Sequence, residues 1–188
     1  MISGIFTKHY GDKTIFDNFH FSVEEGVTTT ITSPSGRGKT TLLRLLSSLE
    51  ENENKEKNDF LSKRYSYLFQ EDRLCPTLSG VENITLCKAE SIGNDEIIEA
   101  MNFLSLSSPE QKVSEYSGGM KRRVAILRAL YAPYDILLLD EPFKGLDEAL
   151  LEKTANFTRK LSEGKTVILV THEERDIKLL NSKNIVRL

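Results

Sequence analysis

A glycine-containing turn between two very different segments constrains the fold of this chain more than any other feature. The segment GVTTTIT, residues 26–32, is rich in β-branched residues and predicts a strand. Residues 39–49 repeat leucine at helical spacing and predict a helix. The intervening SPSGRGK holds two glycines, which allow the sharp turn that joins a strand to a helix. The chain therefore contains a strand–turn–helix unit, which is typical of α/β folds.

This turn matches the tail of the phosphate-loop pattern GxxxxGK[ST] through Gly36, Gly38, Lys39 and Thr40. Glycines let backbone N–H groups surround a phosphate, the lysine reaches the β- and γ-phosphates, and the hydroxyl binds Mg²⁺. Ser33 stands where the pattern has its first glycine, and we expect at most a modest loss of affinity from it. A glycine-rich turn without a ligand is the alternative interpretation.

The rest of the chain alternates between strand and helix patterns, which predicts an α/β fold with a mostly parallel sheet. Strands are expected at residues 4–10, 13–23, 64–70, 135–140, 165–172 and, at an edge, 184–188. Helices are expected within residues 78–106, over residues 117–131, and along the face that Leu150, Thr154, Phe157 and Leu161 share. Residues 50–59 are polar and mixed in charge, and predict a solvated loop. Ligands of such folds bind at the carboxyl ends of the strands.

Bulk composition excludes several classes of protein. A chain of 188 residues suits one domain, and its net charge of −3 argues against a non-specific nucleic-acid binder, so no nucleic-acid partner is expected. No apolar run approaches the roughly 20 residues that cross a bilayer, and the N-terminus lacks a signal-peptide pattern. Cys75 and Cys87 are interpreted as reduced thiols of a cytosolic protein. A membrane role would therefore come through partners.

Acidic and imidazole side chains follow two of the expected buried strands. Asp140 and Glu141 close the run ILLLDE, and His172 follows TVILVT. A carboxylate at a strand end beside a phosphate loop is suited to hold Mg²⁺, and a second one to act as general base for water. His172 is placed to contact the γ-phosphate. The alternatives are a solvated acidic pair and a structural histidine.

Ser117, Gly118 and Gly119 open the helix expected at residues 117–131 and form a second candidate anion site. Two glycines expose backbone N–H groups at the helix start, and the serine adds a hydroxyl. One chain with one phosphate loop does not need two sites for one γ-phosphate. The sequence therefore favours a head-to-tail pair in which this turn of one chain covers the nucleotide held by the other.

The set SPSGRGKTT, FQEDRL, YSGGMKRRVAILRAL, ILLLDEPFKGLD and VILVTH resembles, in order and over essentially the whole chain, the nucleotide-binding domain of ATP-binding cassette (ABC) proteins. The resemblance implies a P-loop NTPase fold, a mostly parallel sheet flanked by helices with a small N-terminal antiparallel β part. It also implies one domain over residues 1–188, with a core of about 1–70 and 132–188 and an inserted helical subdomain of about 71–131.

The resemblance also implies a role for each matched residue, with ATP and Mg²⁺ as cofactors. Glu141, His172, Gln70 and Lys39 would be catalytic, and Thr40, Gln70 and Asp140 would hold the metal. The nucleotide would contact Tyr10, Ser35, Gly36, Arg37, Gly38, Lys39, Thr40 and Thr41 of one chain and Ser117, Gly118 and Gly119 of the other. Tyr10 would stack on adenine, although an ordinary strand tyrosine is the alternative. Asp147 would lie at the dimer seam.

Departures from the family pattern do not remove a catalytic group. Ser33 replaces a glycine, Tyr116 a leucine, Met120 a glutamine, and Gly145 a small alanine-like residue. Residues 49–65 are also few for a full antiparallel β-subdomain.

The stretch LFQEDRLCPTLSGVENI, together with Phe143, is most similar to importer ATPases of the nitrate, sulfonate and taurine type. The implied protein is an ATP-hydrolysing homodimer on the inner face of the cell membrane, cytoplasmic and peripheral, whose partners are a transmembrane permease and a solute-binding protein. Residues 71–76 would contact the permease, or simply form a loop. A soluble non-transport ABC ATPase, an exporter-type subunit, a small P-loop kinase and a cassette that binds ATP without hydrolysis are the alternatives.

Overall fold

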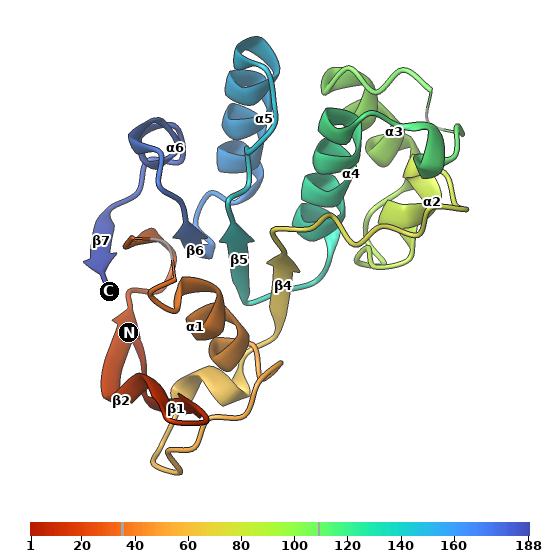
Figure 1. Ribbon diagram of the computed structural model, residues 1–188. Helices are drawn as coiled ribbons and strands as arrows, with labels where there is room; N and C mark the ends of the chain where they lie inside the picture. The colour runs from red at the N-terminus through yellow and green to blue at the C-terminus, as the bar shows by residue number, and fades with distance from the viewer. Residues whose placement is uncertain (35, 109) are drawn as a thin grey trace.

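A computed structural model describes residues 1–34, 36–108 and 110–188, which form two sheets and a group of helices (Figure 1). The larger sheet has five strands in the order β4-β5-β6-β3-β7. These strands are β3 (Thr28–Thr32), β4 (Tyr65–Leu68), β5 (Ile136–Asp140), β6 (Thr166–Val170) and β7 (Asn184–Arg187). All neighbouring pairs are parallel, so the predicted parallel sheet is confirmed, and β7 is the edge strand that the sequence indicated.

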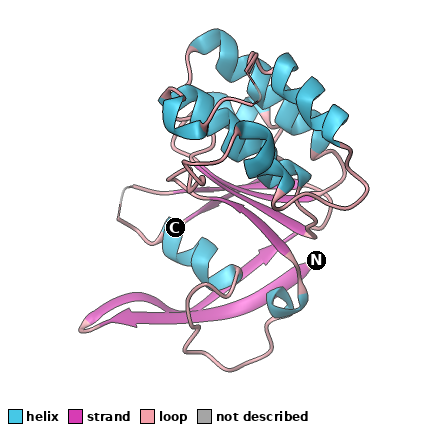
Figure 2. Ribbon diagram, turned by 90° about the vertical axis from the view of Figure 1, so that its right-hand side faces the viewer, coloured by secondary structure: helices cyan, strands magenta, loops and turns pink. Residues whose placement is uncertain are grey.

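The smaller sheet is an antiparallel hairpin of β1 (Ile2–Tyr10) and β2 (Lys13–Val23). Helix α1 (Lys39–Leu46) lies between this hairpin and the five-stranded sheet, as Figure 2 shows. Its leucines are buried against phenylalanines of the hairpin, so one hydrophobic cluster joins the two sheets. The phosphate loop at the start of α1 is thereby held between two packed layers.

Helices α4 (Gly118–Tyr131) and α5 (Glu148–Leu161) cover the opposite face of the five-stranded sheet. Successive residues of β5 point to opposite faces: Leu138 packs in the cluster with α1, and Leu137 and Leu139 pack in the cluster with α4 and α5. All five residues of β5 are buried, which agrees with its unbroken apolar sequence.

Two further helices pack around α4 at one end of the molecule (Figure 1). They are α2 (Gly80–Thr85) and α3 (Asn94–Phe103), with a 3-10 turn η2 (Val113–Glu115) before α4. Ser79 and Glu82 form a capping box at the start of α2. Helix α4 contributes buried residues both to this helical cluster and to the cluster on the sheet, as its apolar sequence on nearly all sides predicted.

One predicted helix boundary is wrong, and one short helix was not predicted. Residues 39–49 were expected to be one helix, but α1 ends at Leu46, where the Ser47 hydroxyl donates to the Leu43 carbonyl and Ser48 is left-handed with φ 57°. The helices expected within residues 78–106 are present as α2 and α3, and Gly93 is the N-cap of α3. The short helix α6 (Glu174–Leu179) was not predicted, because it has few apolar residues.

Residues 50–58 form no helix or strand and are exposed or half-buried, so the predicted solvated loop is confirmed, but this segment also lies along the outer edge of β1. The Asn52 side chain accepts a hydrogen bond of 3.0 Å from Thr7 N and donates one of 2.8 Å to Ile5 O. Glu53 N donates to Thr7 O at 3.1 Å. The segment then enters a 3-10 turn, η1 (Asp59–Ser62), whose Phe60 is fully buried. Unpaired edge groups of a strand attract such partners, and here polar side chains supply them.

Candidate active site

The phosphate loop connects β3 to α1 and depends on glycine at its last turn. Gly38 has φ 91° and caps α1, and a Cβ at this position would lie 2.8 Å from Ile15 Cγ2 and 3.0 Å from Phe16 Cζ. Any side chain would therefore collide with the hairpin as well as force a left-handed backbone. Gly36 also has a positive φ, of 79°. Ser35 and its contacts lie outside the described residues, and Arg37 is exposed.

Lys39 is buried beneath this loop. Its ammonium donates hydrogen bonds to the carbonyl oxygens of Ser33 at 2.7 Å and Pro34 at 3.2 Å. Burial lowers the pKa of Lys39, while the nearby charges of Glu141 and Asp140 raise it. The ammonium is thus held within the turn where a phosphate would enter.

The structure explains how serine is accepted at position 33. Ser33 is not among the described non-glycine residues with a positive φ, so this position does not require glycine. Its hydroxyl donates to the Pro34 carbonyl at 3.2 Å. The expected modest effect of Ser33 on affinity stays a prediction.

Thr40 and Asp140 provide the oxygen ligands that Mg²⁺ prefers. The Thr40 hydroxyl donates to the Asp140 carboxylate at 2.9 Å, and Asp140 is only 2% exposed. Burial raises the pKa of Asp140, while the Thr40 hydrogen bond, Arg122 and Lys39 lower it. Within the described residues, no three His, Cys, Asp or Glu side chains cluster as a closed metal site would require. A hydroxyl and a carboxylate fit Mg²⁺, which also binds phosphate oxygens and water.

Glu141 follows Asp140 with a left-handed backbone, φ 49°, that reverses the chain at the end of β5. Its amide donates to the Val170 carbonyl at 2.9 Å, and its carboxylate lies 3.5 Å from His172 Nε2. Burial raises the pKa of Glu141, His172 lowers it, and Asp140 raises it again. The structure therefore brings Glu141 and His172 together at the carboxyl ends of neighbouring strands; their roles stay predictions.

Gln70 lies just after β4, the strand beside β5. Its side chain is exposed, and its carbonyl accepts a hydrogen bond of 3.3 Å from Arg122 on α4. Sequence reasoning missed Arg122, which is buried and contacts the segments after both β4 and β5. Basic residues within a helix that is otherwise buried nearly all round are a signal that one of them reaches the core, but this signal does not single out Arg122 from Lys121 and Arg123.

The turn of Ser117, Gly118 and Gly119 begins α4, where the Ser117 hydroxyl accepts a hydrogen bond of 3.3 Å from Met120 N. Among the described residues, no hydrogen bond or ion pair joins this turn to the phosphate loop. A Cβ at Gly119 would lie 3.6 Å from Leu146, so the turn is beside the loop after β5. Both candidate anion sites are thus present, and nothing described connects them within one chain.

Tyr10 lies at the tip of the hairpin and is 46% exposed. Its hydroxyl donates to the Glu50 carboxylate, and Lys8 Nζ lies 5.3 Å from its ring centroid. The exposed ring keeps the stacking role open. Thr41 follows on α1 and is half-buried. Asp147 is exposed and caps α5, where its carboxylate accepts a hydrogen bond of 3.0 Å from Leu150 N.

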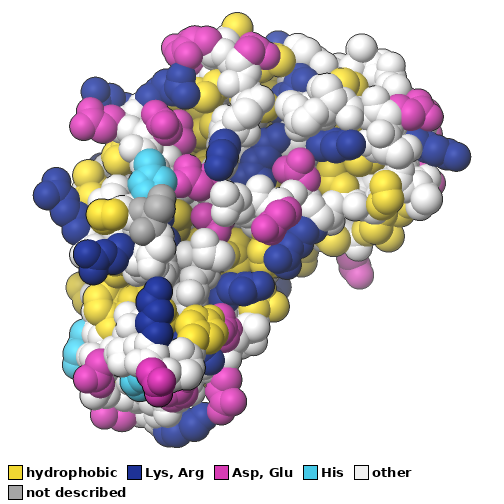
Figure 3. Space-filling model, in the orientation of Figure 1, with side chains coloured by type: hydrophobic (Ala, Val, Ile, Leu, Met, Phe, Trp, Pro, Cys, Tyr) yellow, Lys and Arg dark blue, Asp and Glu magenta, His cyan; other side chains and the backbone are white. Residues whose placement is uncertain are grey.

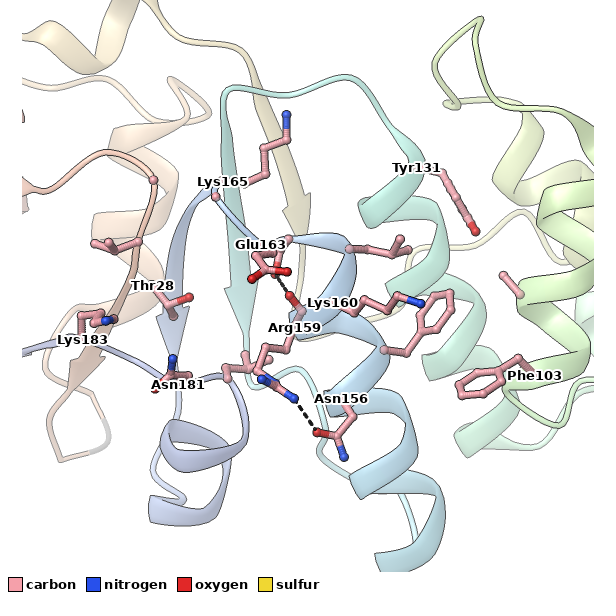
Figure 4. Close-up of a pocket in the computed structure, with 18 of the residues that line it drawn as sticks. Thr28, Phe103, Tyr131, Asn156, Arg159, Lys160, Glu163, Lys165, Asn181 and Lys183 are labelled. Atoms are coloured by element: carbon pink, nitrogen blue, oxygen red, sulfur yellow. Dashed lines mark hydrogen bonds between the residues drawn. The ribbon is translucent and has the colours of Figure 1, made fainter.

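A groove of about 920 Å³ lies away from these residues (Figure 4). It is lined by residues before and at the start of β3 and β6, such as Gly26, Thr28 and Lys165, and by Phe103 and Phe157 of α3 and α5. None of the predicted site residues lines it. The groove is therefore at the amino ends of the strands, and the candidate site is at their carboxyl ends.

On the face that Figure 3 shows, basic and acidic side chains are interspersed. Within residues 1–34, 36–108 and 110–188, no helix has the length and apolar character needed to cross a membrane.

A family model described as ABC transporter matches residues 16–144. The chain belongs to the ABC transporter family. This confirms the predicted resemblance, and with it the class of ABC ATPase.

Two curated relatives of this ABC cassette are import ATP-binding proteins. The spermidine/putrescine import ATP-binding protein PotA of Pasteurella multocida is 34% identical, over 96% of this chain and 53% of that protein. The aliphatic sulfonates import ATP-binding protein SsuB of Bacillus cereus is 34% identical, over 98% of this chain and 78% of that protein. The chain thus spans about half the length of PotA. SsuB belongs to the importer type that the sequence indicated.

A solved structure supports the fold. The ATP-binding cassette MJ0796, in a dimeric post-hydrolysis state bound to ADP and Pi, is 27% identical with a TM-score of 0.79. The match covers 100% of this chain and 91% of that chain. The predicted P-loop NTPase fold is therefore confirmed.

Proposed function

We propose that this cassette is the ATP-hydrolysing subunit of an ABC importer. One observation carries the proposal: Lys39 and Thr40 at the start of α1 meet Asp140, Glu141 and His172 at the carboxyl ends of β5 and β6. A lysine, a hydroxyl and two carboxylates at this place are the groups that phosphoryl transfer to water requires.

Each group has a distinct role in the proposed reaction. Lys39 and the glycine loop bind the β- and γ-phosphates, and Thr40, Asp140 and Gln70 hold Mg²⁺, which neutralises phosphate charge when bound. Glu141 accepts a proton from the attacking water. Because burial raises its pKa, its carboxylate is a stronger base than an exposed one. His172, beside it, contacts the γ-phosphate.

The second half of each site comes from another copy of the chain. Ser117, Gly118 and Gly119 of one subunit cover the nucleotide bound to the phosphate loop of the other, so two sites form when two subunits close. The separation of the two anion sites within one chain supports this arrangement, as does the dimeric state of MJ0796. The helices of about residues 71–131 act as a subdomain that moves with closure.

The partners are a transmembrane permease and a solute-binding protein, with the cassette held on the inner face of the membrane. The import ATP-binding relatives support this assignment. Residues 71–76, next to Gln70, contact the permease, so that closure of the dimer is passed to the membrane.

Glu141→Gln tests the hydrolytic role. The variant should lose MgATP turnover while ATP induces a stable dimer, because water activation is lost and binding is kept. Phosphate release and light scattering after gel filtration measure the two effects. Glu163→Gln is the control, since Glu163 is exposed at the far end of the sheet. Turnover by Glu141→Gln at the wild-type rate contradicts the proposal.

A further inference from the structure

Arg122, on the second turn of α4, is a buried arginine whose guanidinium reaches two separate segments of the core. It is 4% exposed. Its acceptors are the carbonyl oxygens of Phe69 at 2.7 Å, Gln70 at 3.3 Å, Asp140 at 2.8 Å, Glu141 at 2.8 Å and Pro142 at 2.8 Å, and the Asp72 carboxylate at 3.2 Å. The guanidinium is the only side-chain group with five N–H donors in one plane, and it can therefore bind this many acceptors at once.

These contacts continue the link between two strands at the point where their ladder stops. Strands β4 and β5 are paired as far as Leu68 and Leu139. Among the described residues the β4–β5 pairing ends there, and the two segments that follow carry Gln70 and Glu141. Arg122 binds carbonyl groups of both, so the guanidinium replaces the missing backbone pairing.

The contacts also surround a backbone conformation that side-chain-bearing residues rarely adopt. Glu141 has φ 49°, and such a conformation persists only where neighbouring groups fix it. Arg122 Nη2 holds the carbonyls of Asp140 and Glu141, and the Glu141 amide is bonded to Val170 on the other side. The direction of the Glu141 carboxylate therefore depends on Arg122.

We propose that Arg122 is a positioning residue that fixes Glu141 and Gln70 as one unit. A displacement of residues 70–72 would then move the backbone of Glu141 through the guanidinium, with no contact between their side chains. The inference rests on the proposed function, in which Glu141 activates water and the segment after Gln70 contacts the permease.

Arg128 on the same helix provides a matched control. Its guanidinium donates to the carbonyls of Asp72 and Arg73, each at 2.8 Å, and it therefore contacts the segment after β4. Among the described residues, it makes no hydrogen bond to residues 140–142. Replacing Arg128 removes hydrogen bonds to the segment after β4 alone. Replacing Arg122 removes hydrogen bonds to the segments after both β4 and β5.

The kinetic test compares Arg122→Gln, Arg122→Lys and Arg128→Gln with the wild type. Arg122→Gln should lower kcat by at least about tenfold while KM for ATP changes less than about threefold, because misplacing a reacting group affects turnover and not binding. Arg122→Lys, which keeps the charge, should restore part of kcat, and Arg128→Gln should keep it within about twofold. Equal losses in Arg122→Gln and Arg128→Gln would overturn the proposal. If Arg122→Gln does not fold, Arg122→Lys provides the test, and a kcat of Arg122→Lys equal to that of the wild type would overturn the proposal.

A second readout does not depend on hydrolysis. Amide hydrogen exchange of the nucleotide-free protein should become faster in Arg122→Gln for peptides covering both residues 68–73 and 139–144. Arg128→Gln should affect only the first peptide. If amide hydrogen exchange at residues 139–144 is the same in Arg122→Gln as in the wild type, the inference is contradicted even if the wild type hydrolyses ATP. The opposite outcome is also informative. If Arg122→Gln exchanges faster in both peptides but the wild type does not hydrolyse ATP, the link through Arg122 is supported and the proposed function is contradicted.

Discussion

The Thr40 hydroxyl donates a hydrogen bond of 2.9 Å to the Asp140 carboxylate across 100 residues of sequence. It joins the first turn of α1, which follows β3, to the end of β5, and β6 lies between β3 and β5 in the sheet. This bond places the two expected Mg²⁺ ligands together. The relative position of Thr40 and Asp140 is therefore set by contacts within the single folded chain.

Gly38→Ala should damage both stability and nucleotide binding. The left-handed backbone alone costs about 1–2 kcal/mol with a Cβ, and contact with Ile15 and Phe16 adds to this. Chemical denaturation and ATP titration measure the two losses. Gly93→Ala is the control, because a Cβ at Gly93 meets nothing within 4 Å, and we expect a change of at most about 1 kcal/mol. Equal effects of the two substitutions would show that the phosphate loop is not held by the hairpin.

Ser117→Arg should prevent dimer closure and leave ATP binding to the single chain intact. The long cation would fill the place where the turn must approach the nucleotide of the partner. Dimer formation with ATP, followed by light scattering, and ATP affinity at low protein concentration separate the two effects. Ser91→Arg, at an exposed position between α2 and α3, is the control. A dimer that still closes in Ser117→Arg would argue against the composite site.

Glu141→Gln should also stabilise the fold at neutral pH. Burial raises the pKa of Glu141 above the ordinary glutamate value of 4.5, so the native state binds this proton more tightly than the unfolded chain. The carboxyl therefore lowers stability as pH rises through its titration, and the variant removes this effect. We expect the Tm of Glu141→Gln to be a few degrees higher than that of the wild type at pH 7. The difference between the two Tm values should shrink as the pH falls below the pKa of an ordinary glutamate.

The same melting curves with Glu163→Gln, an exposed position, should show no such pH-dependent difference. A Glu141→Gln variant less stable than the wild type at pH 7 would mean that contacts of this carboxylate outweigh its burial.

Asn52→Ala should weaken the hairpin without touching the catalytic groups. Its side chain serves both Thr7 N and Ile5 O, and groups left without partners cost about 1–3 kcal/mol. Urea denaturation measures the loss. Glu56→Ala, exposed in the same segment, should change stability by less than about 0.5 kcal/mol. If both variants match the wild type, the edge contacts of Asn52 add nothing to stability.

The carboxyl-edge residues were predictable because a parallel sheet brings its strand ends to one side. Once ILLLDE and TVILVTH were interpreted as buried strands of one parallel sheet, Asp140, Glu141 and His172 had to share an edge with the phosphate loop. No pattern of this kind describes a contact between one helix side chain and several backbone carbonyls. Arg122 stands between Lys121 and Arg123, and this basic run hides which of the three reaches the ends of the strands.

Residues 50–58 are the loop that the sequence predicted, but their hydrogen bonds to β1 were not predictable. Their composition is that of a loop exposed to water, and side-chain bonds to an edge strand leave no periodic signal. The C-terminal end of α1 was wrongly predicted because a single left-handed residue, Ser48, outweighs the helical propensity of the leucines before it.

The bonds along β1 have a consequence for how freely this region can vary. A third strand would close the edge through backbone groups, which every residue type except proline carries in full. Here Asn52, Glu53 and Asp59 do so largely through their side-chain chemistry. Backbone pairing would not depend on residue identity, whereas these side-chain hydrogen bonds do. Homologous chains with an equally short segment should therefore retain amide or carboxylate side chains at these three positions.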